Sequence, residues 1–214
     1  MNDKTFRIWN YFFGWAVFAI ALFTFGSTVE PTASFWDAGE YISTSAKLQV
    51  GHPPGAPLFQ MIGAFFALFA PSAQKVALMV NFMSVFSSAF TILFLFWTLT
   101  LLLKKLPNFN SLENLSDKIG FFGSAAVGAL AFCFSDSFWF NAVETEVYAM
   151  ATLILSVLFW MGLRWEEEMN TPRGDRWLLM IAFVIGLSFG VHFMGLLTIP
   201  ALGMIYYFKN YKKV

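Results

Sequence analysis

The sequence predicts an all-α fold, a polytopic membrane helix bundle, from its composition and its long apolar segments. Hydrophobic residues make up 58% of the 214 residues and charged residues 12%, whereas about 25% of the residues in a soluble domain are charged. Aromatic residues make up 20% of the chain, which suits acyl chains and membrane interfaces. The net charge of zero gives no indication of nucleic-acid binding, and Cys133 is the only cysteine, which excludes an intrachain disulfide.

The positions of the membrane spans follow from the lengths of the apolar segments, because a crossing helix needs about 20 residues. The last apolar stretch, from Trp177 to Phe208, is too long for one crossing, and its glycines allow it to fold as a hairpin. We therefore expect a single transmembrane domain over residues 1–214. Its six spans are expected at residues 9–28, 76–103, 119–135, 147–163, 177–190 and 193–208.

Residues 29–75 form a predicted outer loop that contains one short apolar segment, Leu58 to Ala70. As a helix this segment is about 20 Å long, which is less than the roughly 30 Å hydrocarbon core. If it does not cross and the N-terminus is cytoplasmic, 11 of the 13 Lys and Arg residues lie inside; if it crosses, only 3 do. Because basic residues favour the cytoplasmic side, we predict six spans and one short non-crossing helix in the outer leaflet.

This topology gathers three polar segments on the outer face: Glu30 to Lys75, Asp136 to Glu146 and the turn around His192. In the first segment, Ser34 and Asp37 have the spacing of a capping box, so we expect a helix to begin there. Asp37, Glu40 and Tyr41 then share one face of that helix. One carboxylate is a candidate general base, and the ordinary alternative is a helix cap beside a solvated glutamate.

Several other polar residues on the outer face are candidates for function. His52 lies in the rigid turn from Gly51 to Pro57 and is either a hydrogen-bonded strut or part of a site. Asn141 and Glu144 again have capping spacing, and Glu146 follows two positions later, so at most one of these glutamates can face a shared site. Asn81 and His192 stand at the outer ends of apolar helices, where they either function or hydrogen-bond between helices. By contrast, we interpret the loop from Arg164 to Arg176, which contains three glutamates, as a solvated cytoplasmic turn.

Three stretches carry a resemblance to a known family: Trp36-Asp37-Ala38-Gly39-Glu40, His52-Pro53-Pro54-Gly55-Ala56-Pro57-Leu58 and Ala142-Val143-Glu144-Thr145-Glu146-Val147-Tyr148. In this order they resemble a bacterial family of unknown function related to protein O-mannosyltransferases, and they are similar to the vertebrate transmembrane O-mannosyltransferase. Both belong to the GT-C superfamily of multi-span enzymes that use polyprenyl-phosphate sugars. The resemblance covers residues 35–58 and 81–200.

The resemblance implies a GT-C-like N-terminal module of a longer protein, an inverting membrane glycosyltransferase. It would transfer a sugar, with mannose as the candidate, from a polyprenyl-phosphate donor to a protein or glycan acceptor on the outer face. It also implies a bacterial inner (plasma) membrane with the active site on the periplasmic side. A membrane transporter and a non-catalytic membrane subunit are the competing classes. A transporter of this kind carries inverted repeats, and the sequence shows no convincing repeat.

The same resemblance assigns roles to individual residues. It implies that Asp37 is the catalytic carboxylate with Glu40 as its neighbour, and that an acid of the second outer loop matches Glu146. Classical relatives carry an arginine where this chain has Asn81, and they carry leucine and lysine where it has Gly55 and Ala56. Donor binding must then come from other groups. The candidates are His52, Lys75, Asn81, Glu146 and His192, with Lys47 as a further cation. A divalent metal held by Asp37 and Glu146 is an open alternative to a metal-free site.

Overall fold

The computed structural model describes residues 3–107, 112 and 114–211, and these residues form helices and turns without a strand. The predicted all-α class is therefore confirmed. In chain order the elements are α1 (Asp3–Ser27), α2 (Ala38–Lys47), α3 (Pro57–Ala67), the 3-10 turn η1 (Ala73–Lys75), α4 (Val76–Leu103), α5 (Leu115–Cys133), α6 (Asp136–Ala142), α7 (Val147–Glu168), α8 (Gly174–Ser188), the 3-10 turn η3 (Phe193–Leu197) and α9 (Thr198–Asn210).

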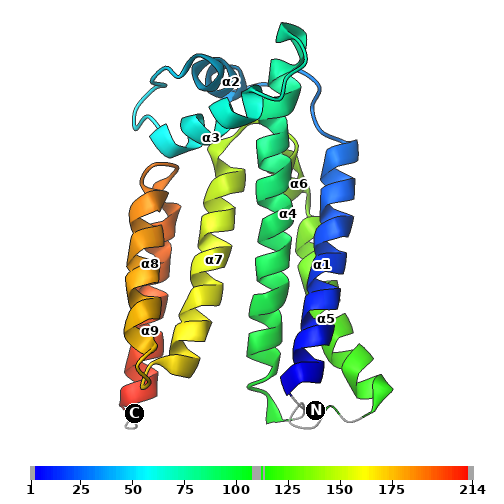
Figure 1. The fold of residues 1–214 in the computed structure, drawn as a ribbon, viewed down its shortest axis with the longest axis vertical. Coiled ribbons are helices and arrows are strands. Elements are labelled where there is room, and N and C mark those ends of the chain that lie inside the picture. Colours follow the sequence, from blue (N-terminus) through cyan, green and yellow to red (C-terminus); the bar gives the residue numbers. More distant parts are fainter. Residues whose placement is uncertain (1–2, 108–111, 113, 212–214) are drawn as a thin grey trace.

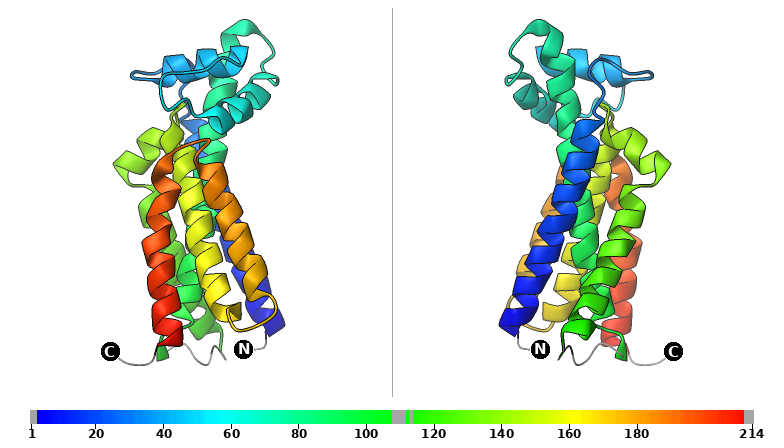
Figure 2. Two further views of the ribbon diagram at one scale, coloured as in Figure 1. Left: turned by 90° about the vertical axis from the view of Figure 1, so that its left-hand side faces the viewer. Right: turned by 90° about the vertical axis from the view of Figure 1, so that its right-hand side faces the viewer.

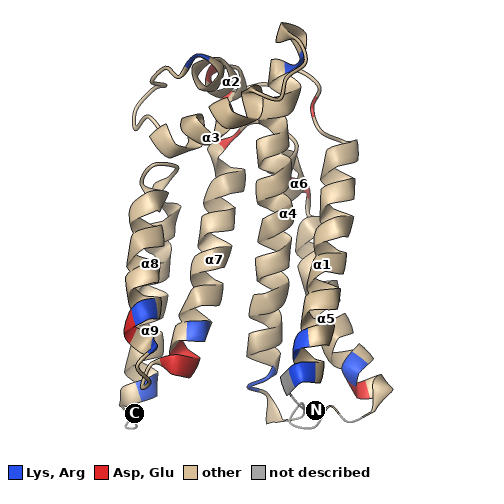
Figure 3. Ribbon diagram, in the orientation of Figure 1, with Lys and Arg blue, Asp and Glu red and all other residues tan. Residues whose placement is uncertain are grey.

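Helices α1, α4, α5, α7, α8 and α9 run lengthwise through an elongated bundle (Figure 1). The segments at residues 28–75, 134–146 and 189–197 lie at one end, which we call the acidic end. Both termini lie at the other end, with the turns that follow α4 and α7 (Figure 1). Lys and Arg gather at this second end (Figure 3), which we call the basic end.

Four of the described helices are long and apolar enough to cross a membrane: Lys4–Ser27, Ala73–Leu103, Leu115–Cys133 and Val147–Glu168. They make the chain an integral membrane protein. Helices α8 and α9 have 15 and 13 residues, which is fewer than the roughly 20 that a span needs. The count of six crossings therefore stays a prediction.

Helices α2 and α3 lie across the acidic end instead of alongside the lengthwise helices, in all three views (Figures 1 and 2). The turn after α8 fixes the start of α3, because the backbone N–H groups of Leu58 and Phe59 donate to the carbonyl of Gly190 at 2.7 and 3.2 Å. A Cβ at Gly190 would come within 2.7 Å of the Leu58 Cβ. This close approach requires glycine, and it joins the first and third polar segments.

Aromatic packing holds the lengthwise helices together and supports α2 and α3. Phe25, Phe96 and Phe121 are fully buried in a cluster between α1, α4 and α5. A second cluster joins α2 and α3 to the upper parts of α4 and α7, and Phe59 is fully buried at its centre. Because this second cluster lies beneath α2, it fixes the position of the carboxylates that α2 carries.

The glutamates near Arg164 form ion pairs, and the turn that we predicted from Arg164 to Arg176 is confined to residues 169–173. The glutamates lie in the last turn of α7. Glu166 pairs with Lys105, which follows α4, and with Lys209 of α9 at 3.7 Å. Arg164 pairs with Glu167 and Glu168 of its own helix. These pairs join the ends of three helices.

Candidate functional site

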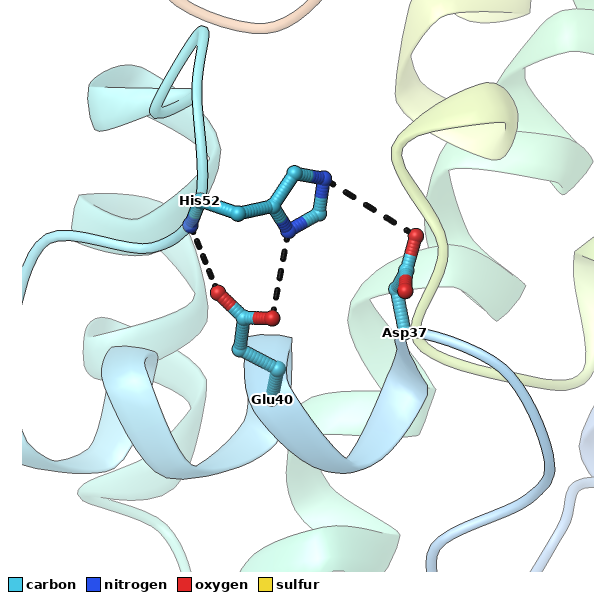
Figure 4. Close-up of side chains that lie close together, drawn as sticks. All are labelled: Asp37, Glu40 and His52. Carbon is cyan, nitrogen blue, oxygen red and sulfur yellow. Dashed lines mark hydrogen bonds and ion pairs between the residues drawn. The ribbon is translucent and has the colours of Figure 1, made fainter.

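Asp37, Glu40 and His52 form a cluster at the acidic end (Figure 4). The His52 Nδ1 atom lies 3.1 Å from Glu40 Oε2, and the backbone N–H of His52 donates to Glu40 Oε1 at 2.6 Å. On the other side of the ring, Nε2 lies 3.9 Å from Asp37 Oδ2. The predicted shared face of Asp37 and Glu40 therefore has one imidazole in front of it. The three side chains are 40 to 55% exposed, so a substrate can reach them.

The start of α2 leaves the Asp37 carboxylate free of the helix. The predicted capping box at Ser34 is wrong, because α2 begins at Ala38 and Asp37 itself occupies the N-cap position without a side-chain cap hydrogen bond. Trp36 has a left-handed φ of 61°, which turns the chain immediately before the helix. The Asp37 carbonyl accepts the first helical hydrogen bond, from Tyr41 N–H at 2.9 Å.

The turn that carries His52 approaches α2 closely at Gly51. A Cβ there would come within 3.1 Å of Glu40 Oε1 and within 2.7 Å of the side-chain amide of Gln60. Gly55 and Ala56 follow with left-handed φ values of 95° and 38°, and this conformation sends the chain back into α3. The small residues of the turn therefore place the imidazole over α2.

The two carboxylates of the cluster differ in their hydrogen bonding. The backbone N–H of His52, followed by its ring, lowers the pKa of Glu40 below the usual range, so Glu40 stays a carboxylate. Among the described residues, the Asp37 carboxylate pairs with a basic group only at His52 Nε2. Asp37 is thus the freer base, and Glu40 orients the imidazole.

Glu146 approaches the cluster from the second polar segment. The backbone N–H of Asp37 donates to the carboxylate of Glu146. Burial, followed by the negative charges of Asp37 and Glu144, raises the pKa of Glu146 to about 7. Glu146 is 7% exposed. The predicted capping role of Asn141 is wrong, because α6 ends at Ala142 and α7 begins only after Glu146.

Tyr41 lies between these acids and the core. Burial, followed by the charges of Glu146, Asp37 and Glu40, raises the pKa of Tyr41 to about 12. Its ring packs against His52 and against Phe59, with centroids 5.8 and 5.2 Å apart. Tyr41 therefore stays protonated and supports the imidazole from below.

The remaining predicted donor-binding residues do not contact the cluster in the described part of the chain. Asn81 is fully buried; its amide donates to the carbonyls of Glu30 and Thr32 at 2.7 and 2.9 Å and accepts from the Thr145 hydroxyl. His192 accepts from the backbone N–H of Met194 at 3.2 Å. The exposed Lys75 makes no ion pair with any described residue.

Sequence reasoning missed two residues that organise this end. Thr145 binds Asn81 and so ties the second segment to the first. Tyr148 packs against His192 with ring centroids 5.5 Å apart, and it contributes to the raised pKa of Tyr41. Both stand within the stretch that carries the resemblance, and their position beside Glu146 was the only available signal.

Three described residues could together hold a metal ion: one ligand atom each from Asp37, Glu40 and His52 lies within 4.8 Å of the others. Imidazole and carboxylate groups suit several divalent metals. Glu146, which we considered as a ligand beside Asp37, is not one of the three.

The comparisons with known proteins place this site in a family. The model of the protein O-mannosyl-transferase TMEM260 N-terminal domain matches residues 37–214. The chain belongs to this family. The TMEM260 N-terminal domain match begins at Asp37, so it includes all three residues of the cluster.

Two curated relatives agree with the family match. Protein O-mannosyl-transferase TMEM260 of Mus musculus is 30% identical over 176 residues, which cover 81% of this chain and 22% of the relative. Protein O-mannosyl-transferase tmem260 of Dictyostelium discoideum is 26% identical over 154 residues, which cover 72% of this chain and 17% of the relative. The chain thus spans about a fifth of the length of these relatives. No solved structure matches it.

Proposed function

We propose that this TMEM260-like chain is the N-terminal module of an inverting, GT-C-type membrane glycosyltransferase. It transfers a sugar, with mannose as the first candidate, from a polyprenyl-phosphate donor to a protein or glycan acceptor. The observation that carries the proposal is the convergence of Asp37, Glu40 and His52 in one exposed cluster, in a family whose curated relatives are named protein O-mannosyl-transferases.

Asp37 acts as the general base in this proposal. A general base must reach the acceptor hydroxyl or amide within hydrogen-bond distance, and the Asp37 side chain is 55% exposed with no helix-capping bond. Glu40 is less suited, because both of its oxygens already interact with His52. When His52 Nδ1 donates to Glu40, Nε2 faces Asp37 and can receive the proton that Asp37 takes from the acceptor.

The donor phosphate leaves from the opposite face of the sugar and needs cations or hydrogen-bond donors. Both ring nitrogens of His52 already face Glu40 and Asp37, so Glu146 is the candidate beside Asp37, with Lys75 and His192 further out on the same end of the bundle. With its pKa raised to about 7, a large share of Glu146 is protonated near neutral pH and can donate to a phosphate oxygen. In this role Glu146 is a neutral carboxylic acid, so it does not repel the anionic phosphate of the donor.

The reaction takes place on the outer face of a bacterial inner membrane in this proposal, with six crossings and with α3 in the outer leaflet. The support is the gathering of Lys and Arg at the basic end (Figure 3), which the positive-inside rule assigns to the cytoplasm. Single cysteines at Ser116 and Ser137 in a Cys133→Ala background test this. An impermeant thiol reagent should label position 137 and spare position 116 in intact cells; the reverse pattern refutes the orientation.

A transporter fits the geometry less well. Ion-coupled carriers hold their charged residues near the middle of the membrane, at broken helices. Here Asp37, Glu40 and His52 lie at one end, and α4 and α7 are continuous through the bundle (Figure 1). A non-catalytic subunit has no need for the cluster at all.

The deciding experiment measures transfer from a radiolabelled polyprenyl-phosphate sugar by the full-length protein. Wild type and Asp37→Asn are compared in the same membranes, with Asp136→Asn as a matched control, because Asp136 is an exposed acid at the acidic end outside the cluster. Activity that Asp37→Asn removes and Asp136→Asn retains supports the proposal. Equal activity of all three refutes the assignment of Asp37.

A further inference from the structure

A cavity of about 600 Å³ lies at the basic end, far along the bundle from the Asp37 cluster. Four lengthwise helices contribute to it, and neither the reaction proposed above nor the family match assigns it a role. Its lining residues are Phe6, Arg7, Asn10, Tyr11, Trp97, Leu101, Lys104, Trp160, Arg164 and Trp177.

The cations of this cavity differ in how they are compensated. Arg164 pairs with Glu167 and Glu168, so its charge is more than neutralised within its own helix. Arg7 and Lys104 lie within ion-pair distance of no carboxylate whose side chain the structure describes. The Lys104 ammonium group instead stands 3.9 Å from the centre of the Phe6 ring. Two positive charges on the cavity wall are thus without a described acidic partner.

The rest of the lining combines aromatic surface with unused hydrogen-bonding groups. Three of the lining residues are tryptophans, and one is a tyrosine. Asn10 Oδ1 and Trp97 Nε1 are buried without a hydrogen-bond partner among the described residues, although such groups in proteins are normally satisfied. An occupant that carries an anionic group and apolar chains would match both halves of this lining.

We propose that the cavity binds the phosphate headgroup of an anionic phospholipid from the leaflet at the basic end. Basic pockets between membrane helices on the cytoplasmic side suit such headgroups. Trp and Tyr rings are typical of the headgroup level. Arg7 and Lys104 hold the phosphate, and the acyl chains lie along the apolar surfaces of α1 and α4. The inference is independent of the reaction at the acidic end.

The test uses the full-length protein purified in a neutral detergent. Retention of phosphatidylglycerol and of phosphatidylcholine is measured by native mass spectrometry, for wild type and for the double variant Arg7→Gln/Lys104→Gln. The expected result is preferential binding of phosphatidylglycerol, weakened about 30-fold in the variant, because each basic residue contributes about 1 kcal/mol and 1.4 kcal/mol is tenfold.

A second double variant, Lys118→Gln/Arg173→Gln, serves as the matched control. It also removes two positive charges from the basic end, but neither residue lines the cavity or forms a described ion pair. It should retain phosphatidylglycerol as wild type does. Equal loss in both double variants, or equal retention of the two lipids by wild type, overturns the proposal.

Two further measurements separate other occupants from a lipid. Inorganic phosphate at millimolar concentration should not displace phosphatidylglycerol; displacement shows a site for a free anion and overturns the lipid assignment. A photo-crosslinking amino acid in place of Tyr11, which is 48% exposed, should attach to lipid. Attachment to another segment of the full-length protein shows that a helix fills the cavity and also overturns it. Size-exclusion profiles of the variants confirm that each remains folded.

Discussion

Glu146 and Glu166 stand near the two ends of the same helix, α7, in opposite surroundings. Glu166 has Lys105 and Lys209 as ion-pair partners, and they compensate a negative charge that is unfavourable at the C-terminal end of a helix. Glu146 stands at the favourable N-terminal end, but its charged neighbours are Asp37 and Glu144, and both raise its pKa. The negative charge of Glu166 is therefore compensated by basic residues, whereas Glu146 lies among other carboxylates.

This difference separates structural carboxylates from candidate catalytic ones. Ion pairs near the surface hold helix ends together at little free-energy cost. Buried like charges destabilise the fold, and perturbed pKa values of this kind gather at functional sites. The like charges at the acidic end therefore support our proposal that the reaction takes place there.

The largest expected effect is on catalysis at Asp37. Asp37→Asn keeps the size of the side chain and removes its basicity, so the transfer rate should fall roughly 10²- to 10⁴-fold, as is typical when a general base is lost. The thermal midpoint should change little, because the carboxylate makes no helix-capping bond. Single-turnover transfer and thermal denaturation of the same preparation measure the two effects. A large loss of stability with unchanged transfer would make Asp37 a structural residue instead of a catalytic one.

The second effect is on the pH dependence of stability at Glu146. Because its folded-state pKa is raised from 4.5 to about 7, the folded state binds the proton more tightly than the unfolded state, and stability falls as pH rises through this window. The loss is complete above about pH 7 and amounts to roughly 3 kcal/mol, at 1.36 kcal/mol per pKa unit. Glu146→Gln imitates the neutral form and should lack this contribution.

The measurement is the free energy of unfolding of wild type minus that of Glu146→Gln, at pH 4.5 and pH 8. Subtraction removes the contributions of other titrating groups, including Glu144, whose pKa burial also raises. The difference should shift in favour of the variant at the higher pH. If the difference in the free energy of unfolding is the same at pH 4.5 and pH 8, the carboxylate of Glu146 does not destabilise the fold and the proposed difference between the two ends of α7 is wrong.

The third effect is structural and concerns Asn81. Asn81→Ala leaves the carbonyls of Glu30 and Thr32 and the Thr145 hydroxyl without their partner, which should cost about 1 to 3 kcal/mol of stability. Denaturation measurements together with the donor KM decide its role. Loss of stability with an unchanged KM supports a strut between the loops, whereas an unchanged stability with a raised KM restores Asn81 as a donor-binding residue.

The sequence predicts what depends on local composition. The length of an apolar stretch limits the length of a helix, so the all-α class and the short segment within 29–75 are visible without a structure. The ion pairs of Glu166 are not visible, because its partners Lys105 and Lys209 are brought together only by the packing of α4 and α9 on α7.

The same distinction applies to the candidate site. Asp37, Glu40 and His52 lie within one short stretch, so helical spacing and a rigid turn are enough to suggest that they meet. The capping boxes failed because Trp36 has a left-handed conformation immediately before α2, which begins only at Ala38, and because α7 begins only at Val147. The contact of Glu146 with the Asp37 backbone joins segments far apart in the chain, and no local pattern encodes it.

The smallest effect is expected at the basic end. Glu166→Gln removes one charge that two lysines share, but the lysine side chains are 40% and 38% exposed, so water and salt already screen these pairs. Exposed pairs contribute about 0 to 1 kcal/mol, and the variant should lose stability within that range. The loss should shrink further in about 1 M salt, where the Debye length falls to about 3 Å. Chemical denaturation with urea, at low and high salt, measures both quantities, and transfer should stay at the wild-type level. A loss of several kcal/mol that persists in high salt would show that Glu166 contributes at least as much to the stability of the fold as Asn81. The two ends of α7 would then no longer differ in the way that we propose.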